Sequence, residues 1–181
     1  IAAEGYTRQT GKIAPVCVTG GPGGTNAITG VFGAYVDSIP MFVVTGQAKR
    51  ETTVWSTNLP LRQLGDQEVN ITSAVSTMTK YAKMITDPMS IRKEVEKAWF
   101  LMLNGRPGPV WLDIPGDVAS TFIETDDLEG FDKQGYIDEH WASFNQDNPV
   151  YDEQYTKDVL AKIKEAKRPV ILAGTVLTAS P

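Results

Sequence analysis

The chain begins with an alternation of apolar runs and a glycine-rich turn that is typical of a parallel sheet. Residues 13–19 (I-A-P-V-C-V-T) are apolar, rich in β-branched side chains and followed by glycines, which predicts a buried strand. Residues 26–36 carry apolar side chains at helical spacing, and residues 41–45 form a second apolar run. A strand, a turn, a helix and a strand in this order predict a βαβ unit with parallel strands.

The pattern then becomes polar before it turns helical again. Residues 47–66 lack a clear period and predict a long loop, and loops of this length are usually functional or disordered. Residues 67–77 favour a short helix, and residues 80–85 favour a short strand. Asp87-Pro88 supplies an N-cap and a first-turn proline for a helix that ends at Asn104-Gly105.

The second half of the chain changes in composition. Residues 109–114 (P-V-W-L-D-I) predict a further strand, whereas residues 117–150 hold nine acidic residues and one lysine and predict a solvated connector. Residues 152–166 return to helical spacing, and residues 168–174 (R-P-V-I-L-A-G) predict a buried strand. The expected division is a first α/β domain, a connector and the start of a second α/β domain: 1–119, 120–150 and 151–181.

Composition narrows the classes of function. The 181 residues include 17 Lys+Arg and 22 Asp+Glu, a net charge of −5, which argues against nucleic acid or an anionic membrane as the main partner. The longest uncharged run, residues 13–36, is interrupted by glycines and predicts no transmembrane helix. The single cysteine, Cys17, excludes an internal disulfide, fits a reducing compartment and is expected to be a small core residue. The chain opens without Met, as if within a helix, so we expect both ends to be cut from a longer protein.

The strongest local signal is the turn G-G-P-G-G-T-N at residues 20–26. Four glycines in five positions let the backbone approach a ligand closely. A turn between a strand and a helix also exposes free N–H groups at the positive end of the helix dipole. On its own the pattern favours phosphate binding and a tight turn without a ligand about equally, and it matches neither the Walker motif nor G-x-G-x-x-G.

Several motifs occur together in a characteristic order. They are A-E-G-Y-T-R-Q-T-G-K, T-G-G-P-G-G-T-N, D-S-I-P-M-F-V-V-T-G-Q, G-D-Q-E, N-G-R-P-G-P-V-W-L-D-I-P-G-D-V and R-P-V-I-L-A-G. Over residues 1 to about 119 this set resembles the N-terminal, pyrimidine-binding domain of thiamine diphosphate enzymes of the acetolactate (acetohydroxyacid) synthase group. The last motif resembles the opening of that group's central domain. The resemblance implies an α/β fold with a mostly parallel sheet and helices on both faces, truncated at its start.

The resemblance assigns the glycine turn to the aminopyrimidine ring of the cofactor. Pro22, Gly23 and Asn26 match positions on the pyrimidine side. Gln67, in G-D-Q-E, matches a glutamine that lines the cofactor and substrate pocket and is the candidate catalytic residue. Arg106, in G-R-P-G-P-V, matches an arginine that contacts FAD in the synthases, with a structural turn as an equal alternative.

Other parts of the site are expected outside this sequence. The resemblance implies that the glutamate that activates the cofactor lies upstream of Ile1, and that Mg²⁺ and the diphosphate are held by a C-terminal domain of a partner subunit. We therefore expect no metal ligands in this chain and no activity from this piece alone.

Three departures from the synthases lie near the substrate entrance. Asp66 stands where the synthases usually carry Phe, and Gly116 replaces a lysine that lines their substrate channel. The loop between Gly46 and Gln67 is about eight residues longer than theirs. These changes place acetolactate formation itself in question and leave the cofactor slot intact.

The implied activity is decarboxylation of a 2-keto acid and transfer of the carbanion to a second substrate, as in branched-chain amino acid biosynthesis. One alternative is a lyase, a decarboxylase or a sugar-modifying acyl transferase on the same fold, and another is a non-catalytic α/β assembly domain. The resemblance implies thiamine diphosphate with Mg²⁺, leaves FAD open, and implies a cytoplasmic homodimer or homotetramer with its active site at the subunit interface.

Overall fold

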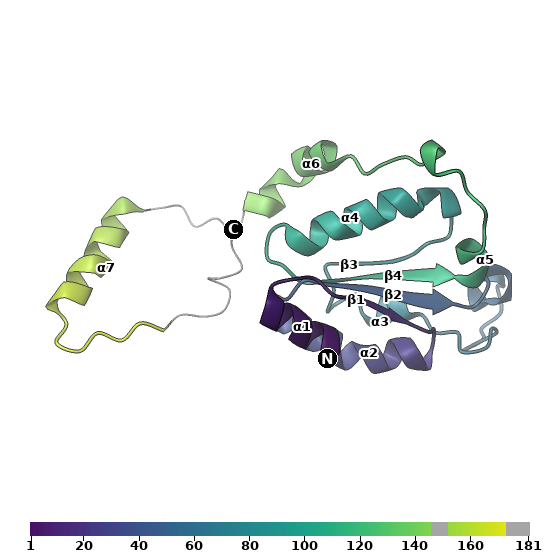
Figure 1. Ribbon diagram of the computed structural model, residues 1–181, viewed down its shortest axis with the longest axis horizontal. Coiled ribbons are helices and arrows are strands. Elements are labelled where there is room, and N and C mark those ends of the chain that lie inside the picture. The colour runs from purple at the N-terminus through teal and green to yellow at the C-terminus, as the bar shows by residue number, and fades with distance from the viewer. Residues whose placement is uncertain (146–151, 173–181) are drawn as a thin grey trace. The chain divides into compact units, whose positions relative to one another are not determined.

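A computed structural model describes residues 1–145 and 152–172, and the chain divides into two compact units, residues 1–133 and 134–181. The centre of the first unit is an entirely parallel sheet in the order β1-β2-β4-β3 (Figure 1). Its strands are β1 (Pro15–Val18), β2 (Met41–Gln47), β3 (Tyr81–Met84) and β4 (Pro109–Pro115). The predicted α/β fold with a mostly parallel sheet is confirmed.

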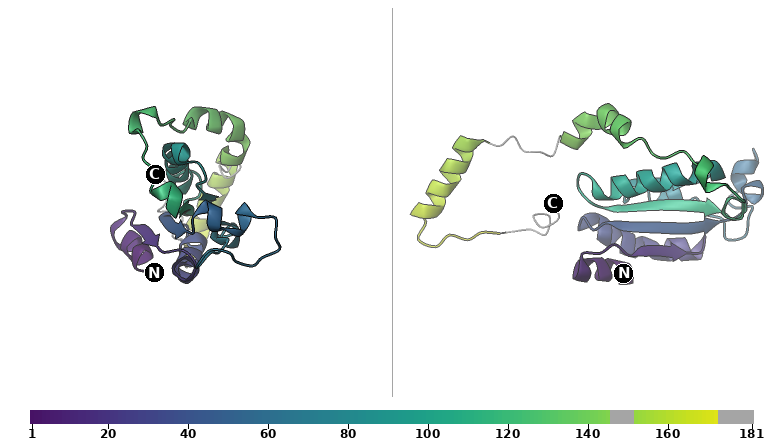
Figure 2. Two further views of the ribbon diagram at one scale, coloured as in Figure 1. Left: turned by 90° about the vertical axis from the view of Figure 1, so that its right-hand side faces the viewer. Right: turned by 45° about the horizontal axis from the view of Figure 1, so that its top comes forward.

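Helices cover both faces of this sheet, as the turned views in Figure 2 show. They are α1 (Ala2–Thr10), α2 (Pro22–Val36), α3 (Ile71–Ala74), α4 (Ile91–Leu103) and α5 (Gly116–Ala119). Val31 of α2 and Ile71 of α3 pack with Trp111 on one face. Met102 of α4 packs with Leu112 on the other. Neighbouring residues of β4 thus point to opposite faces, so a strand that is covered on both sides is apolar throughout.

The boundaries of the predicted elements move by a few residues. The helix α2 begins at Pro22, inside the predicted turn, because proline fits the first helical position. The predicted loop after β2 contains two 3₁₀ turns, Arg50–Thr52 and Val54–Ser56, and the short helix predicted over residues 67–77 is limited to α3. Two further 3₁₀ turns, Pro88–Ser90 and Thr125–Asp127, precede α4 and follow α5.

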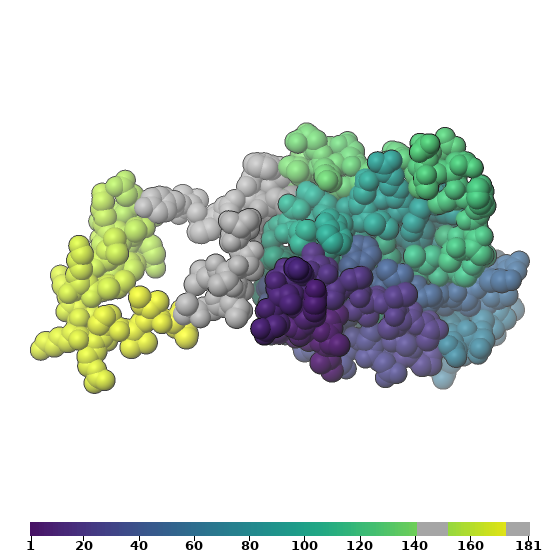
Figure 3. All heavy atoms as spheres, in the orientation of Figure 1, coloured from purple at the N-terminus to yellow at the C-terminus, as the bar shows by residue number. Residues whose placement is uncertain are grey.

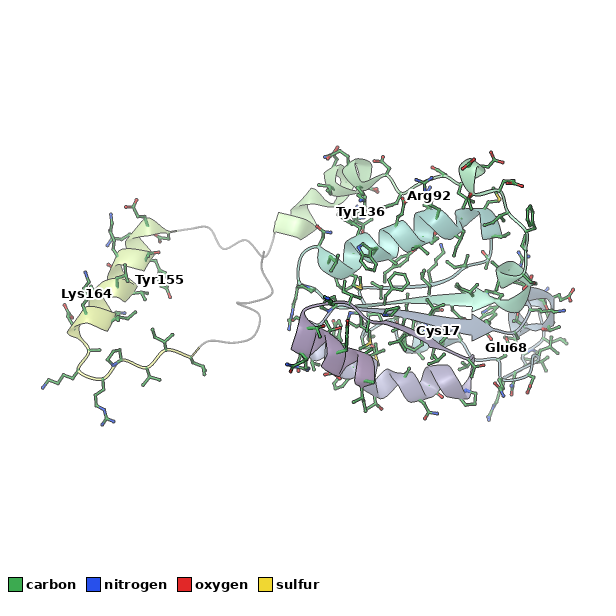
Figure 4. All side chains as sticks on the ribbon, viewed as in Figure 1. Cys17, Glu68, Arg92, Tyr136, Tyr155 and Lys164 are labelled. Carbon is green, nitrogen blue, oxygen red and sulfur yellow. The ribbon has the colours of Figure 1, made fainter. Side chains whose placement is uncertain are left out.

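The expected core position of Cys17 is wrong, because its side chain is exposed (Figure 4). In the described residues β1 pairs with β2 alone, which makes it an edge strand. Exposed and half-buried residues alternate along it, and Val16 packs against the core while Cys17 lies on the opposite face. A β-branched run therefore predicted the strand correctly but did not distinguish an edge strand from a central one.

The first part of the predicted connector lies against the first unit. Glu129 pairs with Lys93 of α4 at 3.4 Å, and the ring of Phe131 lies 5.7 Å from that of Phe100. In the space-filling view the residues between α5 and α6 lie beside α4 (Figure 3), and the Leu128 carbonyl accepts a hydrogen bond from Arg92. The acidic side chains of residues 124–129 are exposed, which agrees with the low cost of charges in water.

The second unit contributes two helices, α6 (Lys133–Asn145) and α7 (Glu153–Glu165). Asp152 caps α7 by accepting hydrogen bonds from the backbone N–H groups of Gln154 and Tyr155. The strand predicted over residues 168–174 is not found at residues 168–172, where the apolar side chains of residues 170–172 are exposed. A strand needs a neighbour to complete its hydrogen bonds, and the described part of this unit contains no other strand. Residues 173 and 174 lie outside the described residues.

Among residues 1–145 and 152–172, none of the helices is both long and apolar enough to span a membrane.

Candidate functional site

The carboxyl ends of β1, β2 and β4 meet at one edge of the sheet, where parallel α/β sheets commonly bind ligands. Residues at the ends of β1 and β2, together with Asp66 and Gln67, line a cleft of about 200 Å³. We call it the Gln67 cleft, and its lining residues are Thr19, Gly20, Gly46, Gln47, Ala48, Asp66 and Gln67. Its lining contains no lysine or arginine, which suits a neutral ring better than a phosphate.

The glycine turn borders this cleft and makes close contacts with the neighbouring loops. A Cβ atom on Gly20 would lie 2.6 Å from the carbonyl oxygen of Gly46. Gly21 has a φ of 54°, and a Cβ atom there would lie 2.4 Å from the carbonyl oxygen of Gln67. The glycines therefore bring the ends of β1 and β2 and the Gln67 backbone together, a role that the sequence did not indicate.

Gln67 has an unusual backbone conformation at the edge of the cleft. Its φ is 57°, in the left-handed region, which costs a residue other than glycine about 1–2 kcal/mol. The side chain is exposed, and the residue lines the cleft together with Asp66. Strained residues of this kind concentrate at functional sites, so Gln67 stays a candidate.

The next residue, Glu68, is buried beside the cleft at the carboxyl end of the sheet (Figure 4). Its Oε1 accepts a hydrogen bond from the N–H of Val54 at 2.7 Å. Its Oε2 accepts from the N–H groups of Leu64 and Gly65 at 2.9 and 3.0 Å. Burial is the largest single influence and would raise the pKa of Glu68, but the hydrogen bonds from Leu64, Gly65 and Val54 together outweigh it and lower the pKa. The carboxylate is therefore held in its charged form.

A second buried polar group joins β2 to β4 beneath the cleft. Asp113 accepts a hydrogen bond from the Thr45 hydroxyl at 2.6 Å and another from the Gln47 amide at 2.9 Å. The indole N–H of Trp111 donates to the Thr45 hydroxyl at 2.9 Å. Burial raises the pKa of Asp113, and the hydrogen bonds from Thr45 and Gln47 partly oppose that rise.

Gln47 connects this network to the cleft that it lines. Its Nε2 also donates to the carbonyl oxygen of Val69 at 2.8 Å, and its Oε1 accepts from the N–H of Ala48 at 3.0 Å. These partners fix the orientation of the amide, because each of its atoms has the matching donor or acceptor.

The remaining candidates lie in three places. Gly23 and Asn26 line a second, larger and more apolar cleft of about 770 Å³ on the β1 side of the glycine turn, and Pro22 is exposed between the two clefts. Gly116 lies beside the Gln67 cleft, where a Cβ atom would be 3.7 Å from the Gln47 carbonyl oxygen. Arg106 precedes β4 at the opposite edge of the sheet and donates to the Ser38 hydroxyl at 2.6 Å and to the Val36 carbonyl. The structure thus brings Gln67, Asp66 and Gly116 together but not Arg106.

Sequence reasoning missed the four buried polar residues that support the cleft, namely Thr45, Gln47, Glu68 and Asp113. The available signal was a polar residue inside an otherwise apolar strand, as in V-V-T-G-Q and W-L-D-I. Within the described part of the chain, no group of three or more His, Cys, Asp or Glu side chains is placed to hold a metal ion.

Comparisons with a family model and with known proteins point to the same group of enzymes. Residues 1–74 match the family described as "Thiamine pyrophosphate enzyme, N-terminal TPP binding domain". The chain is 34% identical over 172 residues to the acetolactate synthase large subunit of Lactococcus lactis subsp. lactis, which covers 95% of the chain and 27% of that protein. It is 35% identical over 175 residues to the large subunit of Buchnera aphidicola, covering 95% and 28%. It is 31% identical over 176 residues to the chloroplastic acetolactate synthase of Arabidopsis thaliana, covering 96% and 24%. The chain thus spans about a quarter of the length of these relatives.

Proposed function

We propose that this chain, whose residues 1–74 match the N-terminal TPP-binding domain of thiamine pyrophosphate enzymes, is part of an acetolactate synthase-like enzyme. The proposed reaction decarboxylates a 2-keto acid and transfers the resulting carbanion to a second substrate. The observation that carries this proposal is the Gln67 cleft, which lies at the carboxyl edge of the sheet in a chain whose similarity to the synthases extends over 95% of its length.

The residues of the cleft fit the pyrimidine half of the cofactor. A side chain on Gly20 or Gly21 would collide with the backbone of Gly46 or Gln67, so only glycine fits at these positions. The lining of the cleft offers amide and hydroxyl groups and no cationic side chain. When bound, thiamine diphosphate supplies the carbanion chemistry. The resemblance also assigns Pro22, Gly23 and Asn26 to the pyrimidine side, although Gly23 and Asn26 line the second cleft and not the Gln67 cleft. We place the activating glutamate, the diphosphate and Mg²⁺ on other parts of the whole protein.

Gln67 is the residue that we propose to act on the substrate. Its side chain is exposed at the cleft. Its backbone is in close contact with Gly21 and precedes Glu68, whose buried carboxylate bonds the N–H of Gly65. An amide on a backbone fixed in this way can donate a hydrogen bond to a substrate oxygen without a change in protonation. Orientation of reacting groups before the reaction contributes to rate because less freedom is lost at the transition state.

A second function on the same fold is supported by the two departures at the cleft. Asp66 places an exposed carboxylate at the entrance, and Gly116 leaves space beside Gln47. A negative charge and an open entrance favour a second substrate with a cationic or hydroxyl-rich group over a second small keto acid. A lyase or a sugar-modifying acyl transferase would have such a substrate.

The contacts of Arg106 favour a structural role for this residue over a role in binding FAD. Its guanidinium group bonds the Ser38 hydroxyl and the Val36 carbonyl, so it joins the start of β4 to the end of α2. These contacts support a structural role at the edge of the sheet opposite the cleft, and FAD binding by the whole protein remains a separate proposal.

Assembly and location follow from the family resemblance. We propose a homodimer or homotetramer whose active site lies between subunits, because the diphosphate-binding part is expected from a partner subunit. The bacterial relatives favour the cytoplasm, whereas the plant relatives are named as chloroplastic.

The test is made on the full-length protein with thiamine diphosphate and Mg²⁺. A panel of 2-keto acids, each alone and with keto-acid or hydroxyaldehyde acceptors, is followed by CO₂ release and by product analysis. Cofactor-dependent CO₂ release with at least one donor is expected. Absence of CO₂ release across the panel, in a protein that is folded and binds the cofactor, would contradict the proposal.

A further inference from the structure

The loop between β2 and Glu68 is not held in place by burial of its large apolar side chains. We call residues 48–66 the entrance loop. Four of its large apolar residues are exposed by between 43% and 62%, and they are Trp55, Leu59, Leu61 and Leu64. Loops with few buried apolar contacts open locally at low free energy unless another interaction fixes them.

At its near end the loop is held by Arg50, which pairs with Asp117 at 2.6 Å. Beyond Arg50, that interaction is the carboxylate of Glu68. Its side chain is 8% exposed and accepts the N–H of Val54 from one part of the loop and the N–H groups of Leu64 and Gly65 from its far end. Within the described residues no ion pair is found for Glu68, so three backbone N–H groups balance its charge. Hydrogen bonds to a charged acceptor are stronger than those between neutral groups, which makes this carboxylate an effective anchor.

The anchor is connected to the wall of the Gln67 cleft through Gly65. This residue is buried, and a Cβ atom on it would lie 2.6 Å from the Cβ of Ala48, which lines the cleft, and 2.8 Å from the carbonyl oxygen of Thr52. The N–H of Glu68 also bonds the carbonyl oxygen of Gly65 at 3.2 Å, which closes a turn around Asp66 and Gln67. Displacement of Gly65 would therefore move both the wall of the cleft and the two residues at its entrance.

We propose that Glu68 is a positioning residue, which holds the entrance loop as a wall of the Gln67 cleft and thereby governs acceptance of the second substrate. The last part of this statement rests on the proposed function, whereas the anchoring of the loop does not. Glu68 itself lies behind the cleft lining and acts through Gly65, Ala48 and Gln67.

The anchoring is tested by amide hydrogen exchange on the full-length protein and its Glu68→Gln variant. The variant replaces one acceptor oxygen by an N–H₂ group that cannot accept. We expect the amides of Val54, Leu64 and Gly65 to exchange at least about tenfold faster, while amides in β2 and β4 are unchanged. Glu51→Gln is the control, because Glu51 is an exposed glutamate of the same loop. Unchanged protection at the three amides, or an equal loss of protection in β2 and β4, would overturn the proposal.

The consequence for the substrate is tested by kinetics of the same variants and of Glu68→Asp. Glu68→Gln is expected to raise KM for the second substrate about tenfold, with a smaller effect on CO₂ release from the donor alone. Glu68→Asp retains the charge on a shorter side chain and should recover part of the protection and part of the affinity. Equal losses in both half-reactions would contradict the positioning role. If the wild type itself releases no CO₂, the proposed reaction fails, and the exchange result still decides whether Glu68 anchors the loop.

Discussion

The polar residues inside the sheet accept only one arrangement of hydrogen bonds. The indole of Trp111 can only donate, so the Thr45 hydroxyl accepts from it and donates its own hydrogen to Asp113. The side chains of Trp111 and Asp113 are fully buried, so no water can replace a lost hydrogen-bond partner without a change of packing. A single hydroxyl thus satisfies two buried groups on the neighbouring strand.

Thr45→Val is therefore expected to be strongly destabilising although its shape is nearly unchanged. It leaves the Trp111 N–H and one Asp113 oxygen unpaired, which should lower the free energy of unfolding by about 2 kcal/mol or more. Denaturant unfolding of both proteins measures this. Thr121→Val serves as the control, because its hydroxyl makes an exposed bond to a nearby carbonyl and should cost little. Equal losses in the two variants would show that the buried bonds are not important for stability.

The same variant should change the dependence of stability on pH. Burial raises the pKa of Asp113 above its unfolded value, so in the interval between the two values the folded protein binds more protons than the unfolded chain. The free energy of unfolding therefore falls as pH rises through that interval. Thr45→Val removes a hydrogen bond that lowers this pKa, so the interval should extend to higher pH. Unfolding curves from about pH 4 upward would contradict this reasoning if their slopes were the same in both proteins.

Gln67→Ala tests the proposed role of the exposed amide. Loss of one preorganised hydrogen bond at the transition state typically lowers turnover roughly 100-fold or more, and we expect that loss in the full-length enzyme. Stability should change little, because alanine in the left-handed region is strained to a similar degree. Gln63→Ala, in the exposed part of the entrance loop, is the control. Full turnover in Gln67→Ala would remove this residue from the mechanism.

Elements with a strong periodic pattern were predictable, and those that depend on distant neighbours were not. The apolar runs at residues 41–45 and 109–114 form the buried strands β2 and β4. Helices cover both faces of these strands, so almost every position in them is apolar. The apolar residues 170–172 form no strand, since in the described part of their unit no partner strand lies beside them. The entrance loop has no period because its conformation depends on the carboxylates of Glu68 and Asp117, which are distant in sequence from the groups they bond, Val54 and Arg50.

The glycine turn depends on the absence of a side chain at Gly21. Gly21→Ala should lower the free energy of unfolding by about 2 kcal/mol or more, because its φ is 54° and the new Cβ atom would meet the Gln67 backbone at 2.4 Å. Gly5→Ala is the matched control, since Gly5 lies within α1 and a Cβ atom there would have no neighbour within 4 Å. That change should instead stabilise by about 0.5–1 kcal/mol. Thermal or denaturant unfolding that gave the same sign for both variants would contradict the close contact.

The residues that the resemblance associated with one region of the molecule lie near one another, and their roles stay predictions. Asp66 and Gln67 line the same cleft, and Gly116 lies beside Gln47 of that cleft. The supporting network of Gln47 and Asp113 was not foreseen, because a polar residue inside an apolar strand does not indicate which residue of a strand far away in sequence it bonds. Arg106 was grouped with the site by resemblance, whereas the length of β4 separates it from the cleft.

The last prediction concerns the choice of the second substrate by the whole enzyme. Asp66 contributes negative charge and little volume at the entrance, and Gly116 contributes neither charge nor volume. A Cβ atom on Gly116 would meet its nearest neighbour at 3.7 Å, an ordinary contact, so a lysine side chain can begin there without strain. Asp66→Phe removes the charge and narrows the entrance, and Gly116→Lys adds a positive charge that attracts a carboxylate. Each variant should therefore shift kcat/KM towards small apolar keto acids and away from cationic or hydroxyl-rich acceptors.

The two variants and their double variant are compared on one panel of acceptors with a constant donor. The carboxylate attraction at Gly116→Lys should weaken as salt is raised, whereas the steric effect of Asp66→Phe should persist, which separates the two causes. Asp126→Phe, an exposed aspartate outside the cleft, is the control and should leave the preference unchanged. If neither variant alters the ratio of kcat/KM values between the two acceptor classes, the departures at residues 66 and 116 do not select the substrate, and the entrance must be sought elsewhere along the loop.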